Sequence, residues 1–297
     1  MKPVSFSAII SSVAHWKAFL HLTLITLTIA SVGLFLFMNA GCSIGPTETR
    51  EDSFAITGQP RIVIKSENGN IEVNAGFGNE VLIEANLRDA PRVSYEVSQT
   101  GDIITIDVKV ERHWWFWGMG GADITVTTPI ETTLELNTSN GFIELHGIRG
   151  SGWIETSNGR LVLDDVKGDF EGRTSNGRIE VEAMEGSAFL RTSNGSVNIK
   201  TSSGEFDVQT SNGSISFGGN MTAGGSNRLV TSNGNVDVKL LGTPSVVLDA
   251  ETSNGDVSSE LPILATVTKK DRLVGEIGLG EADLYIRTSN GNVAIGF

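Results

Sequence analysis

Apolar and polar residues alternate along the chain from Phe54 to Glu111. A period of two with many β-branched residues is typical of strands, and no stretch here keeps the period of a helix. Shorter stretches of the same kind predict strands over 123–127 and 133–136. Between these regions, residues 113–121 bring four aromatic residues and three glycines, which predicts a loop or local insertion. The alternating apolar positions are Ile62, Ile64, Ile71, Val73, Val93, Tyr95, Val97, Ile104, Ile106, Val108 and Val110.

Beyond residue 137 the pattern becomes a repeat. The string Thr-Ser-Asn-Gly occurs eight times, with successive starts 18, 18, 18, 18, 21, 21 and 36 residues apart. Counted from the threonine, position six is apolar in every copy and position eight in all but one, and apolar residues such as Trp153, Ile154, Phe189 and Leu190 return near positions fifteen to seventeen. Each period therefore predicts two short strands, and the gap of 36 predicts one further coil whose motif is blurred. The copies start at Thr138, Thr156, Thr174, Thr192, Thr210, Thr231, Thr252 and Thr288.

A fixed period in this range is typical of stacked repeats. We predict an all-β fold, a single-stranded parallel β-solenoid (β-helix) with about 18 residues per coil. Asn-Gly tolerates positive φ and suits a sharp corner, and a second glycine at position thirteen predicts a second corner. The predicted Asn-Gly corner residues are Asn140, Gly141, Asn158, Gly159, Asn176, Gly177, Asn194, Gly195, Asn212 and Gly213.

The same Asn-Gly pair is a strong hairpin signal, so an antiparallel meander is the alternative. A meander of this length would leave one long apolar face uncovered. A solenoid turns the apolar faces toward each other and stacks equivalent residues about 4.8 Å apart, where asparagine side chains form hydrogen-bonded ladders. Burial of the apolar positions therefore favours the solenoid.

Residues 1–41 have the features of an export signal. They contain no acidic residue, carry Lys2 and Lys17, and run apolar from Leu22 to Met38. Cys42, the one cysteine of the chain, follows Ala40-Gly41 as at a bacterial lipoprotein processing site, which predicts its lipidation. The alternative is an uncleaved membrane anchor, because the apolar stretch is just long enough to span a bilayer.

Three parts follow along the chain. We expect a signal peptide or membrane-inserting leader over 1–41, a flexible polar tether over 42–53, and the solenoid over 54–297. The solenoid is expected to be irregular over 54–137 and regular over 138–297, with Ser66–Gly69 a degenerate copy four periods before Thr138. Either attachment places the body in the cell envelope outside the cytoplasm, in the periplasm or at the cell surface.

Charge and residue inventory exclude several classes of function. The net charge of −13 becomes −15 without residues 1–41, which remove two lysines and no acid, and such a body repels phosphate backbones. Nucleic acid is thus not an expected partner. Outside the leader, the chain has His113, His146 and Cys42, too few for a zinc site, and neither histidine has the context of a catalytic triad. No metal or cofactor is expected.

Acidic residues on the repeats offer the remaining chemistry. They could bind calcium or act in pairs on a glycan, but position seven keeps no carboxylate from one copy to the next. A solvated outer face explains them more simply. The candidates are Asp164, Asp165, Glu180, Glu182, Glu205, Asp207 and Asp237.

The run Asp-Ile-Thr-Val-Thr-Thr-Pro over 123–129, the run Leu-Glu-Leu over 134–136 and the tandem Thr-Ser-Asn-Gly copies resemble the bacterial adhesin family that carries the "toastrack" β-repeat domain. The resemblance covers about residues 54–297. It implies a parallel β-solenoid on the envelope, in a lipoprotein or membrane-anchored protein. It also implies roles in adhesion, surface scaffolding or envelope-stress sensing, without a shared catalytic site.

The aromatic loop is the strongest candidate for contact with a partner. Trp114, Trp115, Phe116 and Trp117 suit binding of a cell-surface glycan or envelope protein, or alternatively plug an open side of the solenoid. The chain stops at Phe297 soon after Val293, so we expect an uncapped last coil and end-to-end self-association. The predicted function is a non-enzymatic, envelope-anchored adhesin-like or scaffolding module. The alternatives are an envelope-stress sensor and a glycan-active β-helix enzyme.

Overall fold

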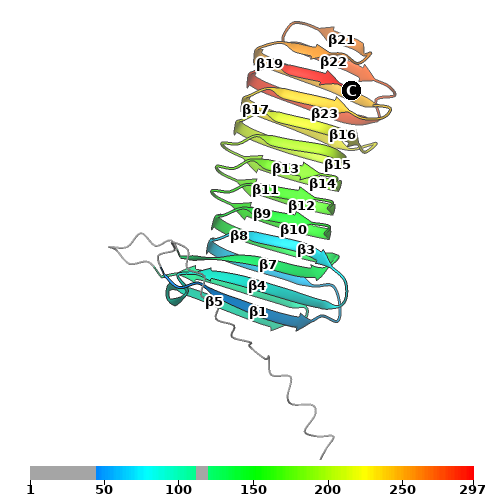
Figure 1. Cartoon of the computed structure of the whole chain (residues 1–297). Coiled ribbons are helices and arrows are strands. Elements are labelled where there is room, and N and C mark those ends of the chain that lie inside the picture. Colours follow the sequence, from blue (N-terminus) through cyan, green and yellow to red (C-terminus); the bar gives the residue numbers. More distant parts are fainter. Residues whose placement is uncertain (1–44, 112–119) are drawn as a thin grey trace, which may run out of the picture. The chain divides into compact units, whose positions relative to one another are not determined.

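The computed structural model describes residues 45–111 and 120–297. These residues form strands and one short 3-10 helix, and none of their helices is long and apolar enough to cross a membrane. The strands stack into two ladders that face each other across an apolar core (Figure 1). Strands of successive coils pair in parallel, with Arg149 beside Lys167 and Lys167 beside Glu185, 18 residues apart each time. The predicted all-β parallel solenoid is confirmed, and the antiparallel meander is excluded for the repeats.

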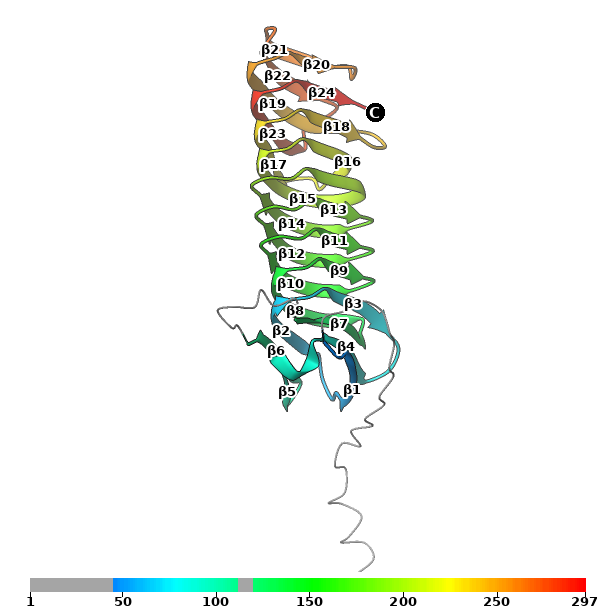
Figure 2. The ribbon, with the colours of Figure 1, turned by 60° about the vertical axis from the view of Figure 1, so that its left-hand side comes forward.

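The two ladders contain different strands, which Figure 2 shows from the side. In spatial order, the first ladder is β5 (Val93–Thr100), β6 (Ile103–Val110), β2 (Arg61–Asn68), β8 (Glu131–Asn140), β10 (Arg149–Thr156), β12 (Lys167–Thr174), β14 (Glu185–Thr192), the second half of β15 (Val197–Asn212), β17 (Ser226–Asn233), β23 (Ala282–Asn290), β19 (Val246–Asn254), β22 (Arg272–Ile277) and β21 (Leu264–Thr268). The second ladder is β1 (Glu48–Ala55), β4 (Glu80–Arg88), β7 (Gly121–Pro129), β3 (Ile71–Gly76), β9 (Ile143–His146), β11 (Leu161–Asp164), β13 (Ile179–Glu182), the first half of β15, β16 (Ile215–Met221), β18 (Val236–Leu240), β24 (Val293–Gly296) and β20 (Val257–Ser259). The 3-10 helix η1 (Ala90–Arg92) joins β4 to β5.

The core is built from the predicted apolar positions. Position six is buried in seven copies and half-buried at Val257. On the longer strands, adjacent apolar residues point to opposite faces. Ile154 and Leu190 are fully buried, whereas Trp153 and Phe189 are half-buried and face outward. The apolar cluster near positions fifteen to seventeen is therefore only partly core.

Each residue of the repeated motif has its own place at the corner. The threonine points inward, and its hydroxyl donates to a glycine carbonyl of the neighbouring coil, as in Thr174 Oγ1 to Gly159 O at 2.9 Å. The serine is exposed in every copy except the last, where Ser289 is half-buried, and the asparagine joins a ladder. The glycine lies so close to the preceding coil that a Cβ on Gly177 would meet Gly159 O at 1.8 Å. No asparagine has positive φ in the described part, and of the motif glycines only Gly69, Gly141 and Gly291 have φ between 136° and 158°, so close approach of the coils is the requirement that all copies share.

The asparagine ladder predicted from the repeat is present. Eight Nδ2–H···Oδ1 bonds of 2.7 to 3.0 Å connect nine asparagines along the stack. In spatial order they are Asn68, Asn140, Asn158, Asn176, Asn194, Asn212, Asn233, Asn290 and Asn254.

The second corner differs from the prediction. Positive φ occurs not only at the predicted glycines of position thirteen, where Gly150, Gly168, Gly186 and Gly204 have φ between 125° and 156°, but also at position ten, where Gly147, Asp165, Ala183 and Thr201 have φ between 49° and 73°. The glycines at position thirteen lie one residue inside the long strands. They are required there because a Cβ on Gly168 would meet Gly150 O at 1.8 Å.

The degenerate first copy lies directly beside the regular array. Ser66 pairs with Thr138 and Asn68 with Asn140, so the predicted separation of four coils is wrong. The intervening chain instead forms the first end of the stack. There β1 pairs with β4, β4 with β7 and β5 with β6, each in antiparallel fashion. The expected tether is also shorter, because residues 48–53 belong to β1 and Pro46 O accepts a hydrogen bond from Ala90 N.

The last coils follow a different order from the chain. Strand β23 lies between β17 and β19, and β24 lies between β18 and β20. In the stack, the copy that starts at Thr288 therefore lies between the copies that start at Thr231 and Thr252. The residues between these copies form no further parallel coil. Strands β21 and β22 form an antiparallel hairpin against β19. The expected blurred coil and uncapped last coil are both wrong, since β24 is paired on both sides.

Substitution of one motif glycine tests the close approach of the coils. Gly177→Ala should lower the free energy of unfolding by about 3 kcal/mol, because the new methyl group must push the Gly159 carbonyl away. Urea unfolding followed by circular dichroism measures the change. Gly218→Ala is the control, since its nearest atom beyond the neighbouring residues is Ile199 O at 3.6 Å. Equal stability of the two variants would contradict the role assigned to the motif glycine.

Tyr95 makes stability depend on alkaline pH. Its hydroxyl donates to Asp52 Oδ2 at 3.0 Å, and burial, followed by the Asp52 charge and this hydrogen bond, raises the pKa of Tyr95 in the folded state. The contribution to stability is therefore complete below the unfolded tyrosine pKa of about 10 and is lost as pH rises above it. Urea unfolding measured from pH 8 to pH 11, about one pH unit above the unfolded pKa, should show this loss of stability. Tyr95→Phe should abolish the dependence on pH. Tyr285→Phe, the change at the other tyrosine, should leave the slope in place.

Candidate functional site

One column of outward side chains runs across the first ladder and alternates acidic with aromatic residues over its first five members. Strand pairing places these residues side by side, and all are half-buried. We call this set the outer column. In spatial order it consists of Glu135, Trp153, Glu171, Phe189, Asp207, Arg228, Tyr285 and Asp249.

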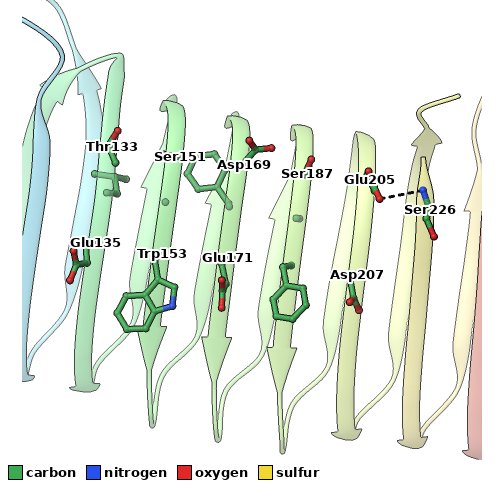
Figure 3. Close-up of a pocket in the computed structure, with 15 residues that line it drawn as sticks. Thr133, Glu135, Ser151, Trp153, Asp169, Glu171, Ser187, Glu205, Asp207 and Ser226 are labelled. Atoms are coloured by element: carbon green, nitrogen blue, oxygen red, sulfur yellow. Dashed lines mark hydrogen bonds between the residues drawn. The ribbon is translucent and has the colours of Figure 1, made fainter. Parts of the chain in front are cut away.

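A groove follows the outer column. The main groove has a volume of about 840 Å³ and crosses β8, β10, β12, β14, β15 and β17 (Figure 3). A second groove of about 540 Å³ crosses β6, β2, β8 and β10. Both are lined by Glu135 and Trp153, so they form one track with Trp153 in its middle.

The strand alternation explains why Trp153 faces the groove. Its neighbours Gly152 and Ile154 are buried on the core side. The ring of Phe170 from the next coil fills the space beside Gly152, where a Cβ would lie 2.7 Å from Phe170 Cδ1. The core is thus closed beneath the indole, which leaves the indole as part of the groove floor.

Arginines hold the carboxylates of the floor. Arg61 Nη2 lies 2.7 Å from Glu135 Oε2, and Arg173 Nη2 lies 2.5 Å from Glu171 Oε1. Asp207 lies between Arg191 and Arg228, at 4.0 and 3.6 Å. These pairs are partly exposed and add little stability, and only those of Glu135 and Glu171 are short enough to orient a carboxylate oxygen.

The two aromatic residues of the floor differ in their contacts. The guanidinium carbon of Arg191 lies 4.1 Å from the ring centroid of Phe189, and that of Arg173 lies 5.8 Å from it. Within residues 45–111 and 120–297, Trp153 has no such cation above its ring. Of these two rings, Trp153 is therefore the one without a stacked arginine among the described residues.

A row of hydroxyl and carboxylate groups borders the floor, labelled in Figure 3. Glu205 Oε1 accepts a hydrogen bond from Ser226 N at 3.3 Å, and Asp169 forms no ion pair in the described part of the chain. The border therefore supplies hydrogen-bonding groups at regular strand spacing. The row consists of Thr133, Ser151, Asp169, Ser187, Glu205 and Ser226.

The geometry suits binding better than cleavage. Glu135 and Glu171 lie two strands apart, about 9.6 Å at the usual strand spacing, a distance close to that of inverting glycosidases. However, Trp153 lies between them in Figure 3, and Arg61 and Arg173 form ion pairs with Glu135 and Glu171 respectively. The indole thus separates the two carboxylates along the groove floor. Among the described residues, no group of three or more potential ligands could hold a metal ion.

Residues 60–296 match the family model described as Toastrack DUF4097. The chain belongs to the Toastrack DUF4097 family. The match confirms the resemblance to the toastrack family that the tandem Thr-Ser-Asn-Gly motif indicated. Among curated proteins, no sequence matches it.

Solved structures give weaker likenesses to the Toastrack chain. A "putative adhesin" from Bacteroides fragilis NCTC 9343 is 12% identical with a TM-score of 0.47, over 84% of this chain and 97% of that one. A "putative lipid binding protein" from Parabacteroides distasonis ATCC 8503 is 10% identical with a TM-score of 0.25, over 85% of this chain and 98% of that one. At these identities and TM-scores, neither likeness carries an argument about function.

The predicted site residues of the Toastrack chain have different outcomes. Cys42 and the aromatic residues Trp114, Trp115, Phe116 and Trp117 lie outside the described residues. Of the acidic candidates, Glu205 and Asp207 line the main groove, whereas Asp164 lies on the second ladder with its Oδ2 3.3 Å from His146 Nδ1.

Sequence reasoning missed the outer column, although a signal was present. Its members stand three residues before the threonine of each motif copy, as Trp153 does before Thr156. A comparison of the residue three before the threonine in successive copies shows the alternation of acidic and aromatic residues. Position seven, which we inspected for a carboxylate ladder, belongs to the second ladder of strands.

Proposed function

We propose that this Toastrack chain is a non-enzymatic, envelope-anchored adhesin-like module that uses the outer column and its groove as a binding surface. The observation that carries the proposal is the position of Trp153, half-buried, outward and shared by both grooves. A solvated face needs no large aromatic residues, whereas aromatics in a groove with fixed polar groups are typical of ligand sites.

The solenoid supports this use because each coil is held on both sides. Parallel pairing, the asparagine ladder and the threonine hydroxyls fix successive strands in register. Side chains on such a frame keep their spacing without a ligand, which lowers the entropic cost of binding. An extended partner can therefore contact several coils at once.

Attachment to the membrane through the leader is part of the proposal. The apolar segment and Cys42 support it. A lipidated chain expressed in a bacterial host should incorporate radioactive palmitate, and Cys42→Ser should abolish the incorporation. Labelling of the Cys42→Ser variant would contradict lipidation at this site. An unlabelled wild-type chain that stays in the membrane fraction would instead favour the uncleaved anchor.

Binding to cell envelopes tests the groove. Full-length chain in detergent, immobilised on beads, should capture isolated bacterial envelopes, and the double variant Trp153→Ala/Phe189→Ala should lower capture by about tenfold. The loss is expected because both aromatic faces leave the groove floor. Soluble sugar released from the envelopes, measured in parallel, should stay at the level without protein.

Phe142→Ala is the matched control for the double variant. Phe142 is also half-buried and lies 4.9 Å from the guanidinium carbon of Arg160, but it is outside both grooves. The Phe142→Ala variant should capture envelopes as the wild type does. Thermal unfolding confirms that the variants are folded. Full capture by a folded double variant would contradict the proposed binding surface, and sugar release would favour the enzyme alternative.

A further inference from the structure

The spacing of the outer column indicates the kind of ligand that the groove accepts. The column runs from strand to strand, so the track lies along the stacking direction and across the strands. Trp153 and Phe189 are two strands apart, about 9.6 Å at the usual spacing. This separation is close to the length of two pyranose rings in an extended chain. A linear polymer would therefore present every second sugar to an aromatic ring.

The alternation of side chains matches the two surfaces of a sugar ring. The C–H face of a pyranose is apolar and packs on an aromatic ring, while its hydroxyl groups donate hydrogen bonds at the edges. Along the floor, the carboxylates of Glu135, Glu171 and Asp207 alternate with the two aromatic residues; arginines contact the first two closely, and Gln209 Nε2 donates to Asp207 Oδ1 at 3.1 Å. The border adds Ser151 and Ser187 beside the two aromatic positions. Each sugar would thus find one stacking surface with acceptors on both sides.

The charge of the groove selects among glycans. Five carboxylates line the main groove, and Arg61, Arg173, Arg191 and Arg228 lie beside three of them. Asp169 and Glu205 have no ion pair within the described residues. With a net charge of −13 over the chain, the groove repels polymers rich in phosphate or uronic acid. A neutral glycan, which brings hydroxyl donors and no charge, fits this lining.

A basic peptide fits the lining less well. At Glu135, Glu171 and Asp207 its cations would need to displace the arginines, because these carboxylates already form ion pairs, so only Asp169 and Glu205 of the five carboxylates would be left to pair with it. Its backbone also presents no flat apolar face at a spacing of two strands. The observations therefore favour a carbohydrate.

We propose that the groove binds a linear, neutral, extended glycan along the stack, with one sugar on Trp153 and the second sugar beyond it on Phe189. This inference rests on the proposed function, since it names the ligand class of the same groove. The carboxylates and arginines of the floor orient the hydroxyl groups, and no covalent step takes place.

Titration calorimetry of the full-length chain in detergent tests the inference. The probes are β-1,4-linked glucose oligomers from the disaccharide to the hexasaccharide, a uronic acid oligomer and oligolysine. Affinity should rise with glucose chain length until Trp153 and Phe189 are both covered, and then level off. Trp153→Ala should weaken binding of the hexasaccharide about tenfold, Phe189→Ala should remove the gain with length, and Phe142→Ala should change neither.

Several outcomes would overturn the inference. They are preferential binding of the uronic acid oligomer or oligolysine, affinity independent of length, or full affinity of a folded Trp153→Ala variant. If the glucose oligomers do not bind, repetition with N-acetylglucosamine oligomers decides whether any neutral chain is accepted. Loss of envelope capture by the double variant without binding of either series would reject the glycan and keep the binding surface. Unchanged envelope capture by the double variant would reject both the glycan ligand and the binding surface.

Discussion

The close approach of successive coils at the Thr-Ser-Asn-Gly corner is the constraint on which the rest of the structure depends. The Gly177 backbone lies so near Gly159 O that no side chain fits, and Thr174 Oγ1 donates to that same oxygen. The carbonyl group is thus satisfied while it is buried between coils, as a buried polar group must be. Since the same geometry recurs at each copy, it sets the register of both ladders.

A frame held in this way leaves its outward positions free to vary. The buried threonine recurs in every copy and position six stays apolar, whereas the outer column changes from Glu135 to Trp153 to Glu171. Stability and recognition are therefore carried by different side chains of one strand. The surface chemistry can change from coil to coil without loss of register, which suits a protein that presents a binding surface.

The parts that the sequence predicts are those governed by local spacing. The motif period, the buried position six and the asparagine ladder follow from one coil and its neighbour. The direction of Trp153 does not, because adjacent apolar residues are equivalent until the strand register is known. Likewise, the close approach at Gly177 depends on the preceding coil, and the left-handed Ala183 and Thr201 carry no local signal. The order of the last coils is a long-range property that no local pattern contains.

That order has a consequence for folding. A solenoid in chain order can add one coil after another, each contact closing a loop of about one period. Here Asn290 bonds to Asn233, 57 residues earlier, and Asn254 reaches its neighbour Asn290 over 36 residues. The coil of β19 and β20 therefore gains its place only after β23 and β24 have paired with β17 and β18. Growth of the stack by simple propagation ends at β18, and the remaining strands form as one cooperative unit with a larger entropic barrier.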